Sequence, residues 1–188
     1  MKFTELNEEQ KAKAIEKHRH INVYDGWDDF LDDEFKEKME PFGFSDIEIS
    51  SDTSFCQGSG ASFTCSDIDL MKYLTASKQL SKYRKLKQWI KDRDLTASIK
   101  RTSHMYNHSN TINISMDLLY SINMTPEQDI LFNELKTDII EFVRRECDEF
   151  HRELETNYHQ LVSDKDVEET IIANEIEFAI KEPNVDYL

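Results

Sequence analysis

The hydrophobic and polar positions along the chain follow two periods, one typical of helices and one typical of strands. Between residues 27 and 40 the apolar side chains recur every three or four positions. This spacing predicts an amphipathic helix with an acidic outer face, which ends at Pro41. A helix is also expected from Asn7 onward, because Asn7 and Gln10 stand in the positions of a capping box.

The middle of the chain carries the strand pattern. Apolar and polar residues alternate over four segments, at residues 44–50, 61–70, 95–106 and 110–119. A period of two predicts strands, and helical spacing returns between the second and third of them, at 70–80 and 82–93. We therefore expect an α+β fold with a sheet of about four, mainly antiparallel strands packed with several helices.

The last third of the chain predicts long helices. Thr125, Pro126 and Gln128 combine an N-cap, a proline at the first helical position and a capping-box glutamine. The apolar stripe that follows runs nearly to Ser163, and a single helix of that extent would be about 54 Å long. The pattern does not decide between one helix and two. A final helix is expected after Ser163.

These elements predict one domain over residues 1–188. The chain has 188 residues and no linker rich in Pro, Gly or Ser, and this length suits a single core. We expect N-terminal helices over 7–40, the sheet over 43–117 and C-terminal helices over 126–181, including a long one.

Net charge narrows the classes of function. The chain carries 38 acidic and 23 basic residues, a formal charge of −15. Such a surface repels nucleic-acid phosphates and anionic membranes and attracts basic partners, so direct nucleic-acid binding is disfavoured. The absence of a long apolar run or signal pattern predicts a cytoplasmic protein without membrane contact. Three cysteines suit a reducing compartment.

The charge is also segregated along the sequence. Residues 25–40 hold eight acids against two lysines, and 127–169 hold fourteen acids against five bases, whereas 78–93 are basic. One interpretation is solvated helix faces, with the basic segment docked on acidic neighbours. The other is an acidic surface for a protein partner. The carboxylates selected for such a surface are Asp28, Asp29, Asp32, Asp33, Glu134, Asp138, Glu141, Glu149 and Glu153.

A loop rich in glycine and cysteine lies between the first two predicted strands, in "SFCQGSGASFTCS" at residues 54–66. A phosphate-binding loop would lead into a helix, whereas this one leads into an alternating segment. We favour a structural hairpin that uses Gly58 and Gly60 for backbone freedom. The loop is still a candidate recognition surface, through Gln57, Gly58, Ser59, Gly60 and Phe63.

Catalytic and metal signals are weak. Cys56, Cys65, His104 and His108 lack the spacing of a zinc site. We expect buried, unreactive thiols, exposed imidazoles, no metal and no cofactor. No catalytic motif is present, so we expect a protein that is not an enzyme. The alternative left open is an enzyme, or a metal or small-ligand binder, with a site around Gln57–Phe63 and His104 and His108.

Three segments carry a resemblance to a known family. They are "FTELNEEQKAKAIEKHRHINV", "QGSGASF" and "HRELETNYHQLVSDKDVEETIIANEIEF". Together they resemble an uncharacterised family of small acidic bacteriophage proteins with a central QGDGASF motif, in which Ser59 here replaces the aspartate. The resemblance implies a phage or prophage protein that acts in the bacterial cytoplasm. It implies no activity, and the loss of the aspartate weakens a catalytic role for the loop.

The leading hypothesis is a non-enzymatic binding protein that inhibits or redirects a host factor with a basic surface. By analogy with small acidic phage proteins, that factor would handle nucleic acid in defence, as in anti-CRISPR or anti-restriction inhibition by a nucleic-acid mimic. Another alternative is a structural or regulatory phage protein that forms a homodimer through its long helix.

Overall fold

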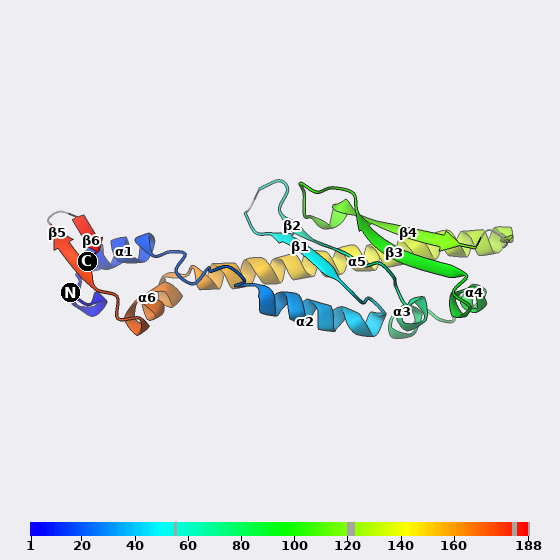
Figure 1. Cartoon of the computed structure of the whole chain (residues 1–188), viewed down its shortest axis with the longest axis horizontal. Coiled ribbons are helices and arrows are strands. Elements are labelled where there is room, and N and C mark those ends of the chain that lie inside the picture. Colours follow the sequence, from blue (N-terminus) through cyan, green and yellow to red (C-terminus); the bar gives the residue numbers. More distant parts are fainter. Residues whose placement is uncertain (55, 120–122, 182–183, 188) are drawn as a thin grey trace. The chain divides into compact units, whose positions relative to one another are not determined.

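The computed structural model describes residues 1–54, 56–119, 123–181 and 184–187, with side chains as far as residue 179 (Figure 1). The chain groups into two compact units. The terminal unit consists of Met1–Asp29 with Leu154–Leu188, and the central unit consists of Phe30–Glu153. That the chain folds as one domain stays a prediction.

The central unit contains most of the regular structure. Its elements, in chain order, are α2 (Asp29–Met39), η2 (Glu40–Phe42), β1 (Glu48–Asp52), β2 (Gly60–Thr64), α3 (Leu70–Ala76), α4 (Lys87–Lys91), β3 (Leu95–Arg101), η3 (Ser109–Thr111), β4 (Ile112–Leu118) and the first part of α5 (Pro126–Leu161). The fold is mixed helix and strand with a long C-terminal helix, as the sequence predicts. The helix expected over 82–93 is shorter, because only Lys87–Lys91 are helical.

The strands form separate ribbons, so the expectation of one four-stranded sheet is wrong. β1 pairs with β2 and β3 pairs with β4, both antiparallel. The two ribbons share one isolated bridge, between Cys65 and Ile99. Beyond this bridge, the segment before β4 lies directly beside β2. A Cβ on Gly60 would come within 2.4 Å of the Cα of His108. The edge of β2 therefore cannot continue its pairing with β3.

The core of the central unit lies between α5, α2 and the inner faces of the ribbons (Figure 1). Alternate strand residues such as Phe63 and Ile99 are buried there, as is the apolar stripe of α5. Aromatic rings dominate it. The ring of Phe35 lies 4.6 Å from that of Phe150 and 5.7 Å from that of Phe63, measured between centroids. Such contacts add to the free energy gained by burying apolar surface.

The terminal unit has a smaller core. It contains η1 (Phe3–Glu5), α1 (Glu8–Lys17), α6 (Asp164–Ala173), the end of α5, and the ribbon of β5 (Phe178–Lys181) and β6 (Asn184–Tyr187). Its buried cluster consists of Phe3, Leu6, Ala14, Ile15, Val167, Ile171 and Phe178. The expectation of helices as far as residue 181 is wrong, because α6 ends at Ala173 and Glu175 has a φ of 51°, outside the helical range.

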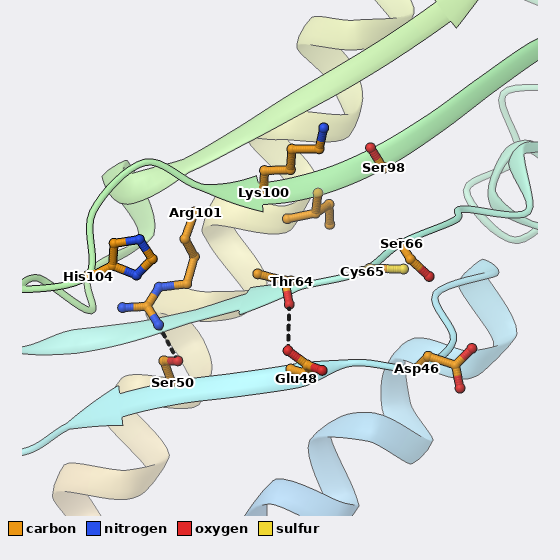
Figure 2. A pocket seen from close by; sticks show the side chains of 11 residues that line it. Asp46, Glu48, Ser50, Thr64, Cys65, Ser66, Ser98, Lys100, Arg101 and His104 are labelled. Carbon is orange, nitrogen blue, oxygen red and sulfur yellow. Dashed lines mark hydrogen bonds between the residues drawn. The ribbon is translucent and has the colours of Figure 1, made fainter.

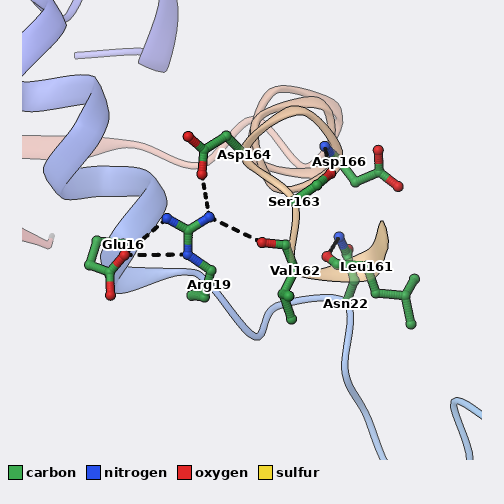
Figure 3. Close-up of polar contacts among 8 residues, drawn as sticks. All are labelled: Glu16, Arg19, Asn22, Leu161, Val162, Ser163, Asp164 and Asp166. Carbon is green, nitrogen blue, oxygen red and sulfur yellow. Dashed lines mark hydrogen bonds and ion pairs between the residues drawn. The ribbon is translucent and has the colours of Figure 1, made fainter. Parts of the chain in front are cut away.

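Arg19 joins the ends of three helices in the terminal unit (Figure 3). Its guanidinium donates to the carbonyl oxygen of Val162 at 3.0 Å, forms an ion pair with Asp164, and contacts Glu16 at 2.9 Å. The carbonyl of Val162 follows the last turn of α5, where backbone acceptors lack helical partners. Arg19 therefore satisfies an exposed helix end and fixes the start of α6 against α1.

The expected helix starts are confirmed. Asn7 and Gln10 exchange two hydrogen bonds of 3.0 Å, and Thr125 forms the corresponding pair with Gln128 at 3.0 and 3.3 Å. Ser163 caps α6 through the backbone nitrogen of Asp166. Residues 126–161 form one continuous helix. Within the described part of the chain, no helix has the length and apolar character needed to cross a membrane.

Candidate functional site

The acidic face of α5 is partly occupied by the chain's own lysines. Lys82 lies 2.8 Å from Asp138 and 3.7 Å from Glu134, and the hydroxyl of Tyr83 donates to Asp138 at 2.6 Å. The hydrogen bond from Lys82 to Asp138 raises the pKa of the lysine. The basic segment therefore docks on α5, as one of the two interpretations of the charge pattern predicts.

A second cluster of ion pairs joins α2 to α5. Lys38 lies 2.9 Å from Glu146 and 3.4 Å from Glu149. Glu146 is almost fully buried and also accepts from Arg145 at 3.0 Å. A buried carboxylate needs such partners, since an unpaired charge in the interior is strongly destabilising. The sequence did not single out Glu146, because its burial depends on how α2 packs.

The remaining selected carboxylates are divided. Glu141 and Glu153 on α5 are exposed, and neither forms an ion pair within the described residues. On α2, Asp33 is exposed and pairs with Lys36 at 3.2 Å, whereas Asp32 is half-buried. Asp29 begins α2 and is exposed. Asp28 is half-buried just before that helix. Whether any of them contacts a partner stays a prediction.

Three exposed carboxylates that the sequence selection omitted lie on the same segment. Glu34 and Glu37 of α2, and Glu40 at its end, are exposed and form no ion pair within the described part of the chain. The spacing of Asp33, Glu37 and Glu40 is that of one helix face, opposite the buried Phe35. The signal that could have found Glu37 and Glu40 is this spacing of four and three from Asp33.

The glycine loop packs closely against the loop that follows β3. A Cβ on Gly58 would lie 2.6 Å from the ring of Tyr106, and Gly60, with a φ of 154°, is equally close to His108. The two glycines therefore permit contact between loops. Phe63 is fully buried in the core, Gln57 is exposed, and Phe55 lies outside the described residues.

Arg101 connects the two loops to β1. It donates to the hydroxyl of Ser50, to the side-chain oxygen of Asn107 at 2.7 Å and to the carbonyl of Tyr106 at 3.3 Å. The backbone nitrogen of Asn107 in turn donates to the carbonyl of Gly58 at 3.0 Å. The sequence left open, as an alternative, one site formed by the glycine loop and the two histidines. The folded chain brings their loops together through the hydrogen bond between Asn107 and Gly58, and Arg101, which the sequence did not select, holds Asn107 against β1.

The three cysteines differ in environment. Cys65 and Cys147 are buried, and burial raises the pKa of both thiols. Cys56 is exposed, so its expected burial is wrong. Hydrogen bonds from the Ser54 and Ser59 hydroxyls, at 3.3 and 3.4 Å, lower the pKa of Cys56 to about 7. No group of three metal-ligating side chains occurs among the described residues.

A groove of about 800 Å³ lies on the outer face of the two ribbons (Figure 2). Its lining includes Glu48 and Ser50 from β1, Thr64 from β2, Lys100 and Arg101 from β3, and His104 from the following loop. The bridging residues Cys65 and Ile99 also line it. The groove exists because the ribbons meet at one point and do not merge into a continuous sheet.

Residues 27–164 match the sequence model of a family described as a domain of unknown function, DUF8835. The chain belongs to this family. No curated protein and no solved structure gives a match. The DUF8835 region includes all of the central unit, and with it the groove, the glycine loop and α2. Most of the terminal unit, including α1 and the β5–β6 ribbon, lies outside the matched range.

Proposed function

We propose that this DUF8835 protein is a non-enzymatic, phage-encoded binding protein that acts in the cytoplasm of a bacterial host. Its acidic surface docks on a basic surface of a host factor, which it inhibits or redirects. A factor that normally holds nucleic-acid phosphates fits this surface best, because carboxylates can take the place of phosphates in such a groove. A homodimer through α5 stays a second prediction from the sequence.

The observation that carries this proposal is the difference between α2 and α5. Lysines of the chain itself neutralise Glu134, Asp138 and Glu149 on α5. The two other carboxylates selected on that helix, Glu141 and Glu153, are exposed but stand twelve residues apart and form no cluster. On the α2 segment, Glu34, Glu37 and Glu40 are exposed without ion pairs in the described part of the chain. Negative charge without internal compensation acts at long range and accelerates association with a positive surface. We therefore assign the docking surface to α2 and its end.

Capture of partners from lysate of the bacterial host tests the proposal. The test variant carries Glu34→Lys, Glu37→Lys and Glu40→Lys, and the control carries Asp117→Lys, Asp129→Lys and Asp148→Lys. Both change the net charge equally, and all six carboxylates are exposed. We expect the wild type and the control to capture the same basic protein, and the α2 variant to lose it.

The captured partner, once purified, allows a quantitative measurement. Its affinity for the wild type should fall at least about tenfold between about 50 and about 300 mM salt, because salt screens exposed charges. Short duplex DNA should compete with binding if the docking surface replaces phosphates. Binding that ignores salt, or equal behaviour of the two triple variants, would contradict the proposed function.

A further inference from the structure

The groove between the ribbons combines charges of both signs. One side carries Lys100 and Arg101 from β3 with His104 from the loop that follows, and the other carries Asp46 and Glu48 from the β1 segment (Figure 2). Its volume of about 800 Å³ lies within the range of small-molecule sites. All of its lining residues belong to the central unit.

The cationic side is not neutralised by the chain. Arg101 is held by three neutral acceptors, the Ser50 hydroxyl, the Tyr106 carbonyl and the Asn107 side chain. Neither it, Lys100 nor His104 forms an ion pair with any described carboxylate. Elsewhere in the central unit, Lys82, for example, pairs with two carboxylates. A positive site that persists in a protein of net charge −15 points to an anionic group as its ligand.

The position of the guanidinium is fixed before any ligand arrives. Its hydrogen bonds connect β1 to the loop after β3, and Asn107 extends that connection to the carbonyl of Gly58. The close contacts of Gly58 and Gly60 with this loop leave little room for it to shift. A charged donor held in this way loses little conformational entropy when it binds a ligand.

The acidic side selects among anions. Asp46 and Glu48 are exposed, and no ion pair within the described residues engages them. Among the described side chains, the one donor to the Glu48 carboxylate is the Thr64 hydroxyl, in a long hydrogen bond of 3.4 Å. These carboxylates repel a simple anion and attract an ammonium group, so a ligand with both charges satisfies both sides of the groove.

We propose that this groove binds a small zwitterionic ligand. Its carboxylate or phosphate lies against Lys100, Arg101 and His104, and its ammonium group lies against Asp46 and Glu48. This binding does not require the acidic surface of α2, so it stands or falls independently of the proposed function. It gives the loop contacts around Gly58 and Asn107 a role in holding a binding site.

Amide chemical-shift titrations of the ¹⁵N-labelled full chain test the inference. The probes are γ-aminobutyrate and O-phosphoethanolamine, which are zwitterions with a carboxylate or a phosphate. Butyrate and butylamine each carry one of the charges alone. We expect at least one zwitterion to shift amides of 46–50 and 98–104 together, with an affinity about tenfold or more above the single-charge probes. The zwitterion that binds identifies which anionic group the groove prefers.

Three variants sharpen the titration without disturbing the hydrogen bonds of Arg101. Lys100→Gln should weaken the zwitterion about fivefold, in line with the loss of one exposed charge contact. Lys91→Gln, an equal change at another exposed lysine, should leave the affinity unchanged. Glu48→Gln should weaken the zwitterion and strengthen butyrate, which reduces the preference between them. Absence of shifts in both segments, equal binding of butyrate, or equal weakening by the two lysine variants would overturn the inference.

Discussion

The terminal and central units differ in net charge and in the size of their hydrophobic cores. The terminal unit has 16 acidic residues against 7 basic ones, a net charge of −9, whereas the larger central unit has 22 against 16, a net charge of −6. Relative to its size, the smaller terminal unit is therefore the more acidic of the two. In the central unit, many charged side chains form ion pairs with each other, as Lys82 and Asp138 do.

The less acidic central unit also has the larger hydrophobic core. The central unit buries a cluster of aromatic rings around α5, including Phe35, Phe63 and Phe150. The terminal unit has a short apolar cluster and depends more on polar contacts such as those of Arg19. Because opening free energies follow buried apolar area, the central unit should be the more stable of the two. The comparison teaches that the net charge of a unit does not show which of its carboxylates lack an ion pair.

The largest expected effect is the loss of a central ring. Phe35→Ala removes contacts with Phe63 and Phe150 and should lower the free energy of unfolding of the central unit by about 3–5 kcal/mol. Urea unfolding followed by tryptophan fluorescence and circular dichroism measures this loss. Phe30→Ala, at an exposed ring on the same helix, should cost about 0.5 kcal/mol or less. Similar costs for the two variants would contradict the assigned core.

A smaller effect is expected in the terminal unit. Arg19→Ala removes the hydrogen bond to the Val162 carbonyl and two exposed ion pairs. Because solvent screens those pairs, the total cost should be about 1 kcal/mol. Hydrogen exchange should show faster exchange in α1 and α6, with central-unit amides unchanged. Lys165→Ala, which breaks only a surface pair at 3.8 Å, serves as the control and should have no effect.

The smallest expected effect concerns thiol reactivity in the central unit, which holds all three cysteines. Because the pKa of Cys56 is lowered to about 7, its thiolate fraction and alkylation rate should rise with pH around pH 7 and level off above it. Cys65 and Cys147 should stay unmodified while the unit is folded. Ser59→Ala removes a hydrogen bond to the Cys56 sulfur and should slow alkylation at pH 7 about threefold.

Mass spectrometry of alkylated peptides across a pH series gives these rates. A midpoint near the ordinary thiol pKa in the wild type would contradict the assigned hydrogen bonds. Early modification of Cys65 or Cys147 would show instead that the central unit opens readily, against the stability order stated above.

The expectations that held rest on local contacts. The caps at Asn7, Thr125 and Ser163 each involve residues three positions apart, so sequence spacing is sufficient to predict them. The apolar stripe of α5 likewise lies within one helix. The expectations that proved wrong concern features that depend on contacts between segments far apart in the chain. The apolar spacing continues to Phe178, yet α6 ends at Ala173 and Glu177 forms a β-bridge with Lys2 from the other end of the chain.

The sequence by itself determined the helix starts, the strand periodicity and the total charge, because each depends on residues close in the chain or on composition alone. Tertiary structure decided which carboxylates stay exposed without an ion pair. It also decided that the two ribbons join at the bridge between Cys65 and Ile99 and do not form one sheet. It also placed Arg101 beside Ser50, 51 residues apart in the chain. Strand pairing and charge compensation depend on packing between distant segments, which no local pattern records.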